Sequence, residues 1–431
     1  MSSHDGAQPD GQRPQSSVGN QPVANGRDVR TGAPPGAALD KREPKQTARL
    51  RIAIVHSFYS SRVPSGENVV VETEMRALLR AGHRVELFAA RTDELEQRPL
   101  YRLSSALHAS LGVGRSPLHE LADFAPDVIH IHNLFPNWGS RWIGSLEAPF
   151  VATLHNFRTI CANGLLFRDD EVCTLCPDGS SLSAVRYACY RDSRVATAPL
   201  AFATQRAPAA HPLLRSARRI IVLSEVARAI YVRYGVPGHK LTVWPNFLDA
   251  GADPGWADGR PDDYWLSVGR LGREKGVLLL VEAWPSDTKL VLVGDGPHRR
   301  AVEQAARGKR IEVLGLQPRE HVMNLMRSAA GLVFPSRCFE SFPMVYAEAM
   351  ATGLPVLAWK PNVVATMVEQ HGTGMATTWS DDLAMTLSRA AESFPSLRQR
   401  CRKVFEEQMS ERSYLDRAES LYQDVVGSPL P

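Results

Sequence analysis

The stretch from residue 331 to 358 constrains the fold most, because it reads as strand, loop, helix and strand in one short run. An apolar run, Leu332–Phe334, stops at Pro335, and a second apolar run begins shortly after Gly353. Between them, Met344–Met350 has the pattern of a helix that Gly353 would close. Parallel strands joined by a helix are the building unit of a doubly wound α/β sheet.

Two glutamates stand where such a unit holds a ligand. Glu340 lies in the loop after the first strand, and Glu348 lies inside the helix. Ligands of parallel sheets bind beyond the carboxyl ends of the strands, and a helix start offers free N–H groups to phosphate. Carboxylates for hydroxyls beside amides for phosphate suit a nucleotide sugar. The plainer alternative is a solvated loop charge and a helix-surface charge.

The spacing Glu340-x7-Glu348, followed by Ala-Met-Ala-Thr-Gly-Leu-Pro-Val, resembles the E-x7-E signature of retaining glycosyltransferases of family four. The resemblance covers about Arg51 to Gln423. It implies an α/β protein of GT-B fold, in which two Rossmann-like domains face a cleft. It also implies that Glu340 contacts the donor sugar and Glu348 the ribose. Unlike many relatives, this chain has no glycine directly after Glu340, where Ser341-Phe342-Pro343 stands, and Pro343 has no N–H to offer phosphate.

A second donor element follows the predicted strand Trp265–Val268, which runs into Gly-Arg-Leu-Gly-Arg-Glu-Lys-Gly. Glycine lets the backbone approach a ligand closely, and a cation offsets the charge of a departing diphosphate. The resemblance assigns Arg270 and Lys275 to that diphosphate. Without it, both residues could equally be cations of an exposed loop.

Three further positions match the family. Gly66 stands in the loop after the first predicted strand, and Gly296 belongs to a Gly-x-Gly-Pro turn. His155 closes a Thr-x-His at a strand end, where relatives contact the donor sugar, whereas His132 on the neighbouring strand is weighed mainly as a packed histidine. The predicted catalytic residues are Glu340, His155, Arg270 and Lys275. The predicted donor-binding residues are Gly66, Arg270, Lys275, Gly296, Phe342, Met344, Val345 and Glu348.

The predicted organisation has five parts. Residues 1–48 lack aromatic residues and are rich in small and polar ones, which predicts a disordered tail. The remaining parts are an acceptor-side Rossmann-like domain at 49–246, a linker at 247–261, a nucleotide-sugar-binding domain at 262–410, and a helix at 411–431 that packs back on the first domain. Ser413 is the predicted N-cap of that helix.

An unusual insert at Phe157–Arg194 holds four cysteines: Cys161, Cys173, Cys176 and Cys189. Four cysteines around one C-x2-C could form a structural zinc site. The spacing is not that of a common zinc ribbon, so reduced structural thiols are the alternative. Six cysteines in 431 residues do not suggest a secreted disulfide scaffold, and a reducing cytoplasm is the expected location.

The stretch Arg186–Arg219 is basic, with arginines among apolar residues. It is interpreted as a surface that contacts anionic lipid, with ordinary solvated helix faces as the alternative. No apolar run is long enough for a membrane span. A net charge of only +4 does not indicate strong nucleic-acid binding.

The sequence therefore predicts a retaining hexosyltransferase that needs no metal or cofactor. It would move sugar from a nucleotide donor to a glycan or lipid-linked acceptor in cell-envelope or exopolysaccharide synthesis. Two alternatives stay open: a GT-B epimerase acting on a nucleotide sugar, and a non-catalytic nucleotide-sugar-binding scaffold.

Overall fold

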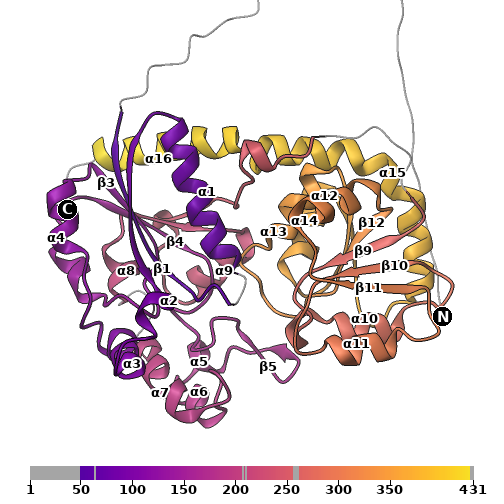
Figure 1. The fold of residues 1–431 in the computed structure, drawn as a ribbon, viewed down its shortest axis with the longest axis horizontal. Helices are drawn as coiled ribbons and strands as arrows, with labels where there is room; N and C mark the ends of the chain where they lie inside the picture. The colour runs from indigo at the N-terminus through magenta and orange to yellow at the C-terminus, as the bar shows by residue number, and fades with distance from the viewer. Residues whose placement is uncertain (1–48, 63–64, 206–207, 209–210, 256–261, 428–431) are drawn as a thin grey trace, which may run out of the picture. The chain divides into compact units, whose positions relative to one another are not determined.

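The computed structural model describes residues 49–62, 65–205, 208, 211–255 and 262–427. The predicted tail at 1–48 and residues 256–261 of the predicted linker lie outside them. Two parallel sheets, each of six strands, carry the described chain (Figure 1). The prediction of an α/β fold with two Rossmann-like sheets is confirmed.

The first sheet has the strand order β2-β1-β3-β4-β7-β8. Its strands are β1 (Arg51–Phe58), β2 (Arg84–Arg91), β3 (Val128–Asn133), β4 (Phe150–Leu154), β7 (Arg219–Val222) and β8 (Leu241–Val243). Alternate residues of β1 enter different cores: Ile52 and Ile54 on one face, Ala53 and Val55 on the other. This is the period-two pattern of a strand buried on both faces.

The second sheet has the order β11-β10-β9-β12-β13-β14. Its strands are β9 (Trp265–Val268), β10 (Leu290–Val293), β11 (Ile311–Gly315), β12 (Gly331–Phe334), β13 (Val356–Trp359) and β14 (Gly374–Thr377). A short antiparallel hairpin of β5 (Phe167–Arg168) and β6 (Glu171–Val172) lies in the cysteine-containing insert. Thus the strand-loop-helix-strand reading of the 331–358 stretch is correct, with α13 (Met344–Ala351) as its helix.

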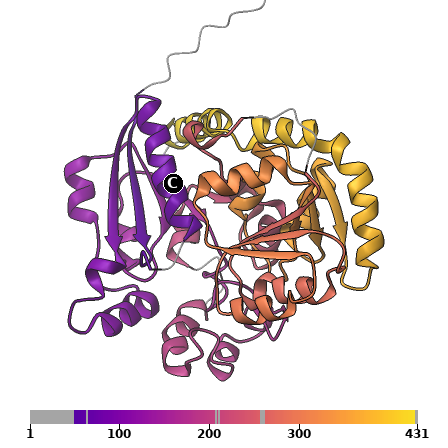
Figure 2. The ribbon, with the colours of Figure 1, turned by 45° about the vertical axis from the view of Figure 1, so that its right-hand side comes forward.

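Helices cover both faces of the sheets (Figure 1, Figure 2). Those of the first half are α1 (Gly66–Arg80), α2 (Thr92–Leu95), α3 (Tyr101–Leu111), α4 (Leu118–Phe124), α5 (Leu175–Asp178), α6 (Leu182–Arg186), α7 (Arg194–Thr204), α8 (Pro212–Ser216) and α9 (Glu225–Arg233). Those of the second half are α10 (Val277–Ala283), α11 (Arg299–Ala305), α12 (Arg319–Ser328), α13, α14 (Val363–His371), α15 (Leu383–Gln408) and α16 (Glu411–Gly427).

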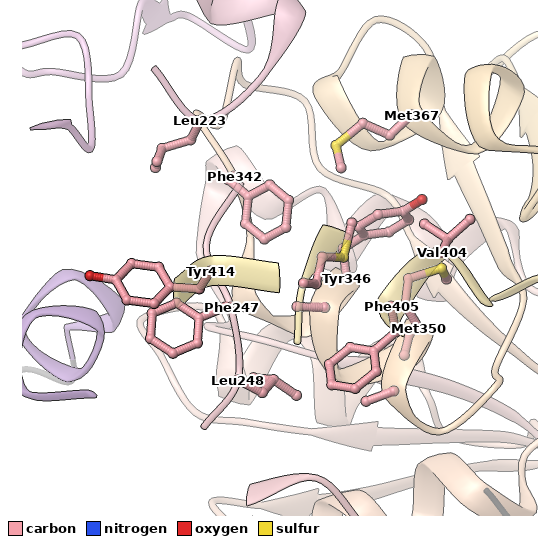
Figure 3. Close-up of a cluster of buried hydrophobic side chains, with 14 of the residues drawn as sticks. Leu223, Phe247, Leu248, Phe342, Tyr346, Met350, Met367, Val404, Phe405 and Tyr414 are labelled. Atoms are coloured by element: carbon pink, nitrogen blue, oxygen red, sulfur yellow. The ribbon is translucent and has the colours of Figure 1, made fainter. Parts of the chain in front are cut away.

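The largest hydrophobic core contains side chains of both sheets and of the last two helices. In it the ring of Phe247 stacks on that of Tyr414, with 3.9 Å between centroids (Figure 3). Beside them the N–H of Leu248 donates to the carbonyl of Met409 at 3.0 Å. The first residues of the predicted linker are therefore a packed part of the core.

Helix α16 returns to the first sheet, where it lies against α1 and β3. Arg80 of α1 forms a bidentate ion pair with Glu411, at 3.0 and 2.7 Å. The predicted N-cap is wrong, because Ser413 is already inside the helix. Instead, Ser410 Oγ accepts the N–H of Ser413 at 3.2 Å, so the serine three residues earlier satisfies the exposed donor.

Ser410→Ala should therefore loosen the first turn of α16, whereas Ser413→Ala should not remove the cap. Loss of an N-cap hydroxyl costs about 1 kcal/mol of helix stability. Hydrogen exchange of the amides of the first turn is the measurement. Faster exchange in Ser413→Ala than in Ser410→Ala would contradict the cap assignment.

Candidate active site

A pocket of about 370 Å³ lies between the carboxyl ends of strands from both sheets. Predicted site residues supply much of its lining: Gly66, His155, Lys275, Glu340, Phe342, Met344 and Val345. Gly66 is the first residue of α1, which follows β1 of the first sheet, and Met344 is the first residue of α13, which follows β12 of the second sheet. A Cβ added to Gly66 would lie 3.7 Å from Met344 Cγ, so the two helix starts approach closely across the pocket.

Lys275 and Glu340 form an ion pair in this pocket, with Nζ 2.7 Å from Oε2. Ser336 donates its hydroxyl proton to the other oxygen of Glu340 at 2.6 Å. Although burial alone would lower it, the neighbouring carboxylate holds the pKa of Lys275 above its ordinary value. The pocket thus contains a fixed cation and a carboxylate whose orientation is set by a hydroxyl.

His155 lies at the end of β4 and lines the same pocket. Its Nε2 is 2.9 Å from Nδ1 of His132 at the end of β3. Burial, and then the neighbouring His132, hold the pKa of His155 well below its ordinary value. A neutral imidazole has one nitrogen that donates a hydrogen bond and one that accepts, so at this place it can bind a hydroxyl group.

Sequence reasoning missed Glu67, which lines this pocket together with His155. The same two residues line a second pocket of about 110 Å³ in the first half of the chain. One carboxylate oxygen accepts from Asn156 Nδ2 at 3.3 Å, and the other is buried without a partner among the described residues. Burial raises the pKa of Glu67 to about 8, against a partial opposing effect of Arg158.

A signal for Glu67 was present in the sequence. It is a carboxylate in the first turn of the helix that follows the first strand, and it comes directly after Gly66. Parallel-sheet geometry places that turn on the ligand side. Only the structure shows that the side chain turns inward between the two pockets.

Arg270, Gly296 and Glu348 do not line the pocket. Arg270 is half-exposed and pairs with Glu274. Glu348 pairs with Arg319 at 3.3 Å, and its burial raises its pKa. The expected convergence of two cations and two acids is therefore met in this structure only by Lys275 and Glu340.

Gly296 has a structural explanation that requires no ligand. A Cβ at this position would lie 2.6 Å from the carbonyl oxygen of Leu271 and 2.8 Å from other atoms of its backbone. Only glycine fits such a close approach. The packing of the loops after β9 and β10 thus requires glycine in this Gly-x-Gly-Pro turn, whether or not the turn contacts a nucleotide as predicted.

The thiols of Cys161, Cys173, Cys176 and Cys189 are all free. Burial, followed by the nearby thiols of Cys161 and Cys189, raises the pKa of Cys176 to about 12. Within the described ranges, the only set of three or more candidate ligands within 4.8 Å of one another is a different one, Glu74, His130 and His132. The four sulfurs are not gathered into a cage here, and zinc at them stays a prediction.

Two family profiles match consecutive parts of the chain. The profile described as Glycosyltransferase Family 4 matches residues 64–251, and that of Glycosyl transferases group 1 matches residues 257–407. The first covers the sheet with His155, and the second covers the sheet with Lys275 and Glu340. The chain belongs to glycosyltransferase family four. Its GT-B fold and its identity as a glycosyltransferase follow from this membership.

Individual relatives of this glycosyltransferase are distant. It is 30% identical over 147 residues to the N-acetyl-alpha-D-glucosaminyl L-malate synthase of Bacillus anthracis, covering 32% of this chain and 38% of the relative. It is 33% identical over 126 residues to the lipopolysaccharide 1,2-N-acetylglucosaminetransferase of Salmonella typhimurium, covering 25% and 33%. Both alignments span well under half of the relative.

A solved structure supports the fold. The Anabaena protein HepE, in complex with UDP-glucose, superposes with a TM-score of 0.57 at 18% identity. The alignment covers 86% of this glycosyltransferase and 99% of that chain. At such low identity the likeness concerns the architecture.

The raised pKa of Glu67 makes a prediction about stability. Between its ordinary value of 4.5 and about 8, the folded chain holds a proton that the unfolded chain releases. The unfolding free energy of the wild type should therefore fall relative to Glu67→Gln as pH rises through this window, by at least about 1 kcal/mol.

Thermal unfolding of both proteins from pH 4 to pH 9 measures this difference. Glu72→Gln, on the same helix and outside both pockets, is the matched control. A constant difference in Tm between the wild type and Glu67→Gln across the range would contradict the raised pKa.

Proposed function

We propose that this glycosyltransferase moves a hexose from a nucleotide-sugar donor to a glycan or lipid-linked acceptor, with retention of anomeric configuration. The observation that carries the proposal is the Lys275–Glu340 pair in a pocket shared with His155. A cation for diphosphate, a carboxylate for sugar hydroxyls and a neutral imidazole meet there. The relative that acts on lipopolysaccharide and the neighbour in complex with UDP-glucose support the choice of acceptor and donor classes.

On the donor side, Lys275 would offset the charge that develops on the departing diphosphate. The start of α13 has no side-chain cap, and its first residues, Met344 and Val345, line the pocket. Their backbone N–H groups are suited to a phosphate at the positive end of the helix dipole. With these groups present, the transfer would need no metal ion.

Glu340 would hold a hydroxyl of the donor sugar, since Ser336 and Lys275 fix both of its oxygens. Glu348 lies outside the lining of this pocket and pairs with Arg319, so it would take the ribose hydroxyls only by giving up part of that ion pair. Retention would follow if the acceptor attacks on the face from which the diphosphate leaves, and a diphosphate oxygen receives the acceptor's proton. Glu67, between the two pockets, would hydrogen-bond the incoming hydroxyl.

Lys275→Ala should lower the transfer rate by more than tenfold, which corresponds to at least about 1.4 kcal/mol of transition-state stabilisation. Arg270→Ala should have a smaller effect, because Arg270 is half-exposed and pairs with Glu274. A thermal-shift screen of UDP, GDP and ADP sugars identifies the donor, and release of nucleotide then gives the rate.

Product analysis separates the proposal from the alternatives. A new glycosidic bond with the donor's anomeric configuration supports retention. Formation of an epimer without nucleotide release would contradict transfer, and so would unchanged turnover in Lys275→Ala. Lys403→Ala, at an exposed lysine of α15 outside the pocket, is the matched control.

We also propose that the enzyme contacts an anionic membrane through α3 and α7, which are neighbours in the fold (Figure 1). Leu103, Leu107 and Leu111 follow each other at four-residue spacing on α3, and all are exposed. Val195 of α7 is 85% exposed. Exposed arginines occur on α3, on α7 and on α6, which is a neighbour of α7, and in the loop before α7: Arg102, Arg194, Arg186 and Arg191.

An apolar stripe flanked by cations is the composition of an interfacial surface. Arg206 of the predicted basic stretch lies outside the described residues. Within the described ranges, no helix combines the length and apolar character that crossing a bilayer requires. The proposal is therefore contact through a surface of the folded domain.

Val195→Asp should weaken binding to vesicles with an anionic lipid by about tenfold, because it replaces apolar contact with a repelled charge. Flotation with anionic and neutral vesicles is the measurement. Leu316→Asp, at an exposed leucine beside β11, is the matched control. Equal flotation of Val195→Asp and wild type would contradict this surface.

A further inference from the structure

A cluster of buried polar groups lies behind His155, and the transfer chemistry proposed above does not use it. Glu74 comes from α1, His130 and His132 from β3, and Tyr422 from α16. Their relative exposures are 3%, 1%, 4% and 0% in that order. Burying several polar groups together is unfavourable unless they satisfy one another, so such a cluster specifies a defined arrangement.

The contacts form a connected path from α16 to the pocket. Tyr422 donates its hydroxyl proton to Glu74 Oε1 at 3.3 Å, and His130 Nδ1 is 2.6 Å from the same oxygen. His132 Nε2 faces that oxygen at 3.4 Å, which is an electrostatic contact, because this nitrogen has no hydrogen-bond partner among the described residues. His132 Nδ1 is then 2.9 Å from Nε2 of His155, which lines the pocket.

Glu74, His130 and His132 also have ligand atoms within 4.8 Å of one another, as a metal site would. The 2.6 Å between Glu74 and His130 is nevertheless a hydrogen-bond distance. Two ligands of a tetrahedral zinc, each about 2.0–2.1 Å from the ion, are roughly 3.3 Å apart. The distances therefore favour a hydrogen-bonded cluster.

The arrangement favours one placement of the protons. The carboxylate oxygen 3.4 Å from His132 Nε2 is too far for a well-formed hydrogen bond, but it is the charge that this nitrogen faces, so a proton is favoured on Nε2 and a lone pair on Nδ1. His155 must then donate its own Nε2 proton to His132. His155 Nδ1 has no hydrogen-bond partner among the described residues, so its lone pair is free to accept from a hydroxyl.

The supporting charges agree with this assignment. Burial alone would raise the pKa of Glu74, but His130 and His132 outweigh burial and hold it well below its ordinary value, so the carboxylate is ionised. Burial lowers the pKa of His132, which keeps that ring neutral and able to accept.

We propose that Glu74, acting through His132, positions His155 and fixes it in the tautomer with its proton on Nε2. Tyr422 holds Glu74 for this task, so α16 helps to set a side chain in the pocket that it does not touch. All three are positioning residues. A sugar hydroxyl would then donate its proton to His155 Nδ1. This last step rests on the proposed transferase function.

The test is a long-range ¹H–¹⁵N correlation spectrum of the full chain labelled with [¹⁵N]histidine, with His155→Gln to assign the signals of His155. In the wild type His155 should show the Nε2-protonated tautomer alone. His132→Phe removes the acceptor and should give a mixture of tautomers. Tyr422→Phe, a milder change, should shift the signals in the same direction by less.

His83→Gln is the matched control, since His83 is also a buried histidine facing α16, with Nε2 3.9 Å from Glu419. It should leave the signals of His155 unchanged, because the contacts of His83, the N–H of Leu50 and the carboxylate of Glu419, lie outside the cluster. If His132→Phe does not fold, Tyr422→Phe against His83→Gln still decides. In turnover assays His132→Phe should lower kcat about tenfold, with a smaller change in KM.

Signals of His155 that are the same in wild type, His132→Phe and Tyr422→Phe would overturn the inference. Stoichiometric bound zinc that is lost in His132→Phe would overturn it too, because a metal would then organise the cluster. The variants could show the expected tautomer changes while the wild type transfers no sugar. That result would support the positioning of His155 and would remove only the proposed function.

Discussion

The ion pair between Lys275 and Glu340 is the contact on which the pocket depends. Its two residues come from loops after β9 and β12, neighbouring strands of the second sheet. Each partner is only partly exposed, so each would be costly to bury without the other. In the absence of substrate the pair keeps both side chains directed into the pocket. A donor diphosphate would compete for the lysine and leave the carboxylate, still held by Ser336, for the sugar.

The two sheets are joined by more than the connecting chain. Phe247, Tyr414 and Leu248 belong to one core with side chains of both sheets. Helix α16 extends this junction over the face of the first sheet that carries α1, through Arg80 and the buried cluster around Glu74. The pocket therefore stands on a shared core, and its first-half residues are supported by the last helix of the chain.

Much of this organisation could be predicted from the sequence. The apolar runs that became β10 and β12 are short and continuous and end at a glycine or a proline, as strands buried on both faces often do. Strand-end position and family spacing agree on Lys275, Glu340 and His155, and these three residues line one pocket in the structure, while their roles stay a prediction. The pairing of Arg270 with Glu274 and of Glu348 with Arg319 could not be found, since rotamers and neighbouring loops decide it. Glu67 was missed because its significance lies in burial, which the sequence does not display, and the cap at Ser410 was misplaced by three residues.

The place of Tyr422 has a consequence for how the chain matures. Its hydroxyl meets His130, a residue 292 positions earlier in the chain. During synthesis, the strands of both sheets emerge from the ribosome before α16 does, and domains generally fold in that order. The first sheet can therefore form while the space for Tyr422 is still empty. On this order of events, the first sheet would form before His155 gains the support that α16 provides.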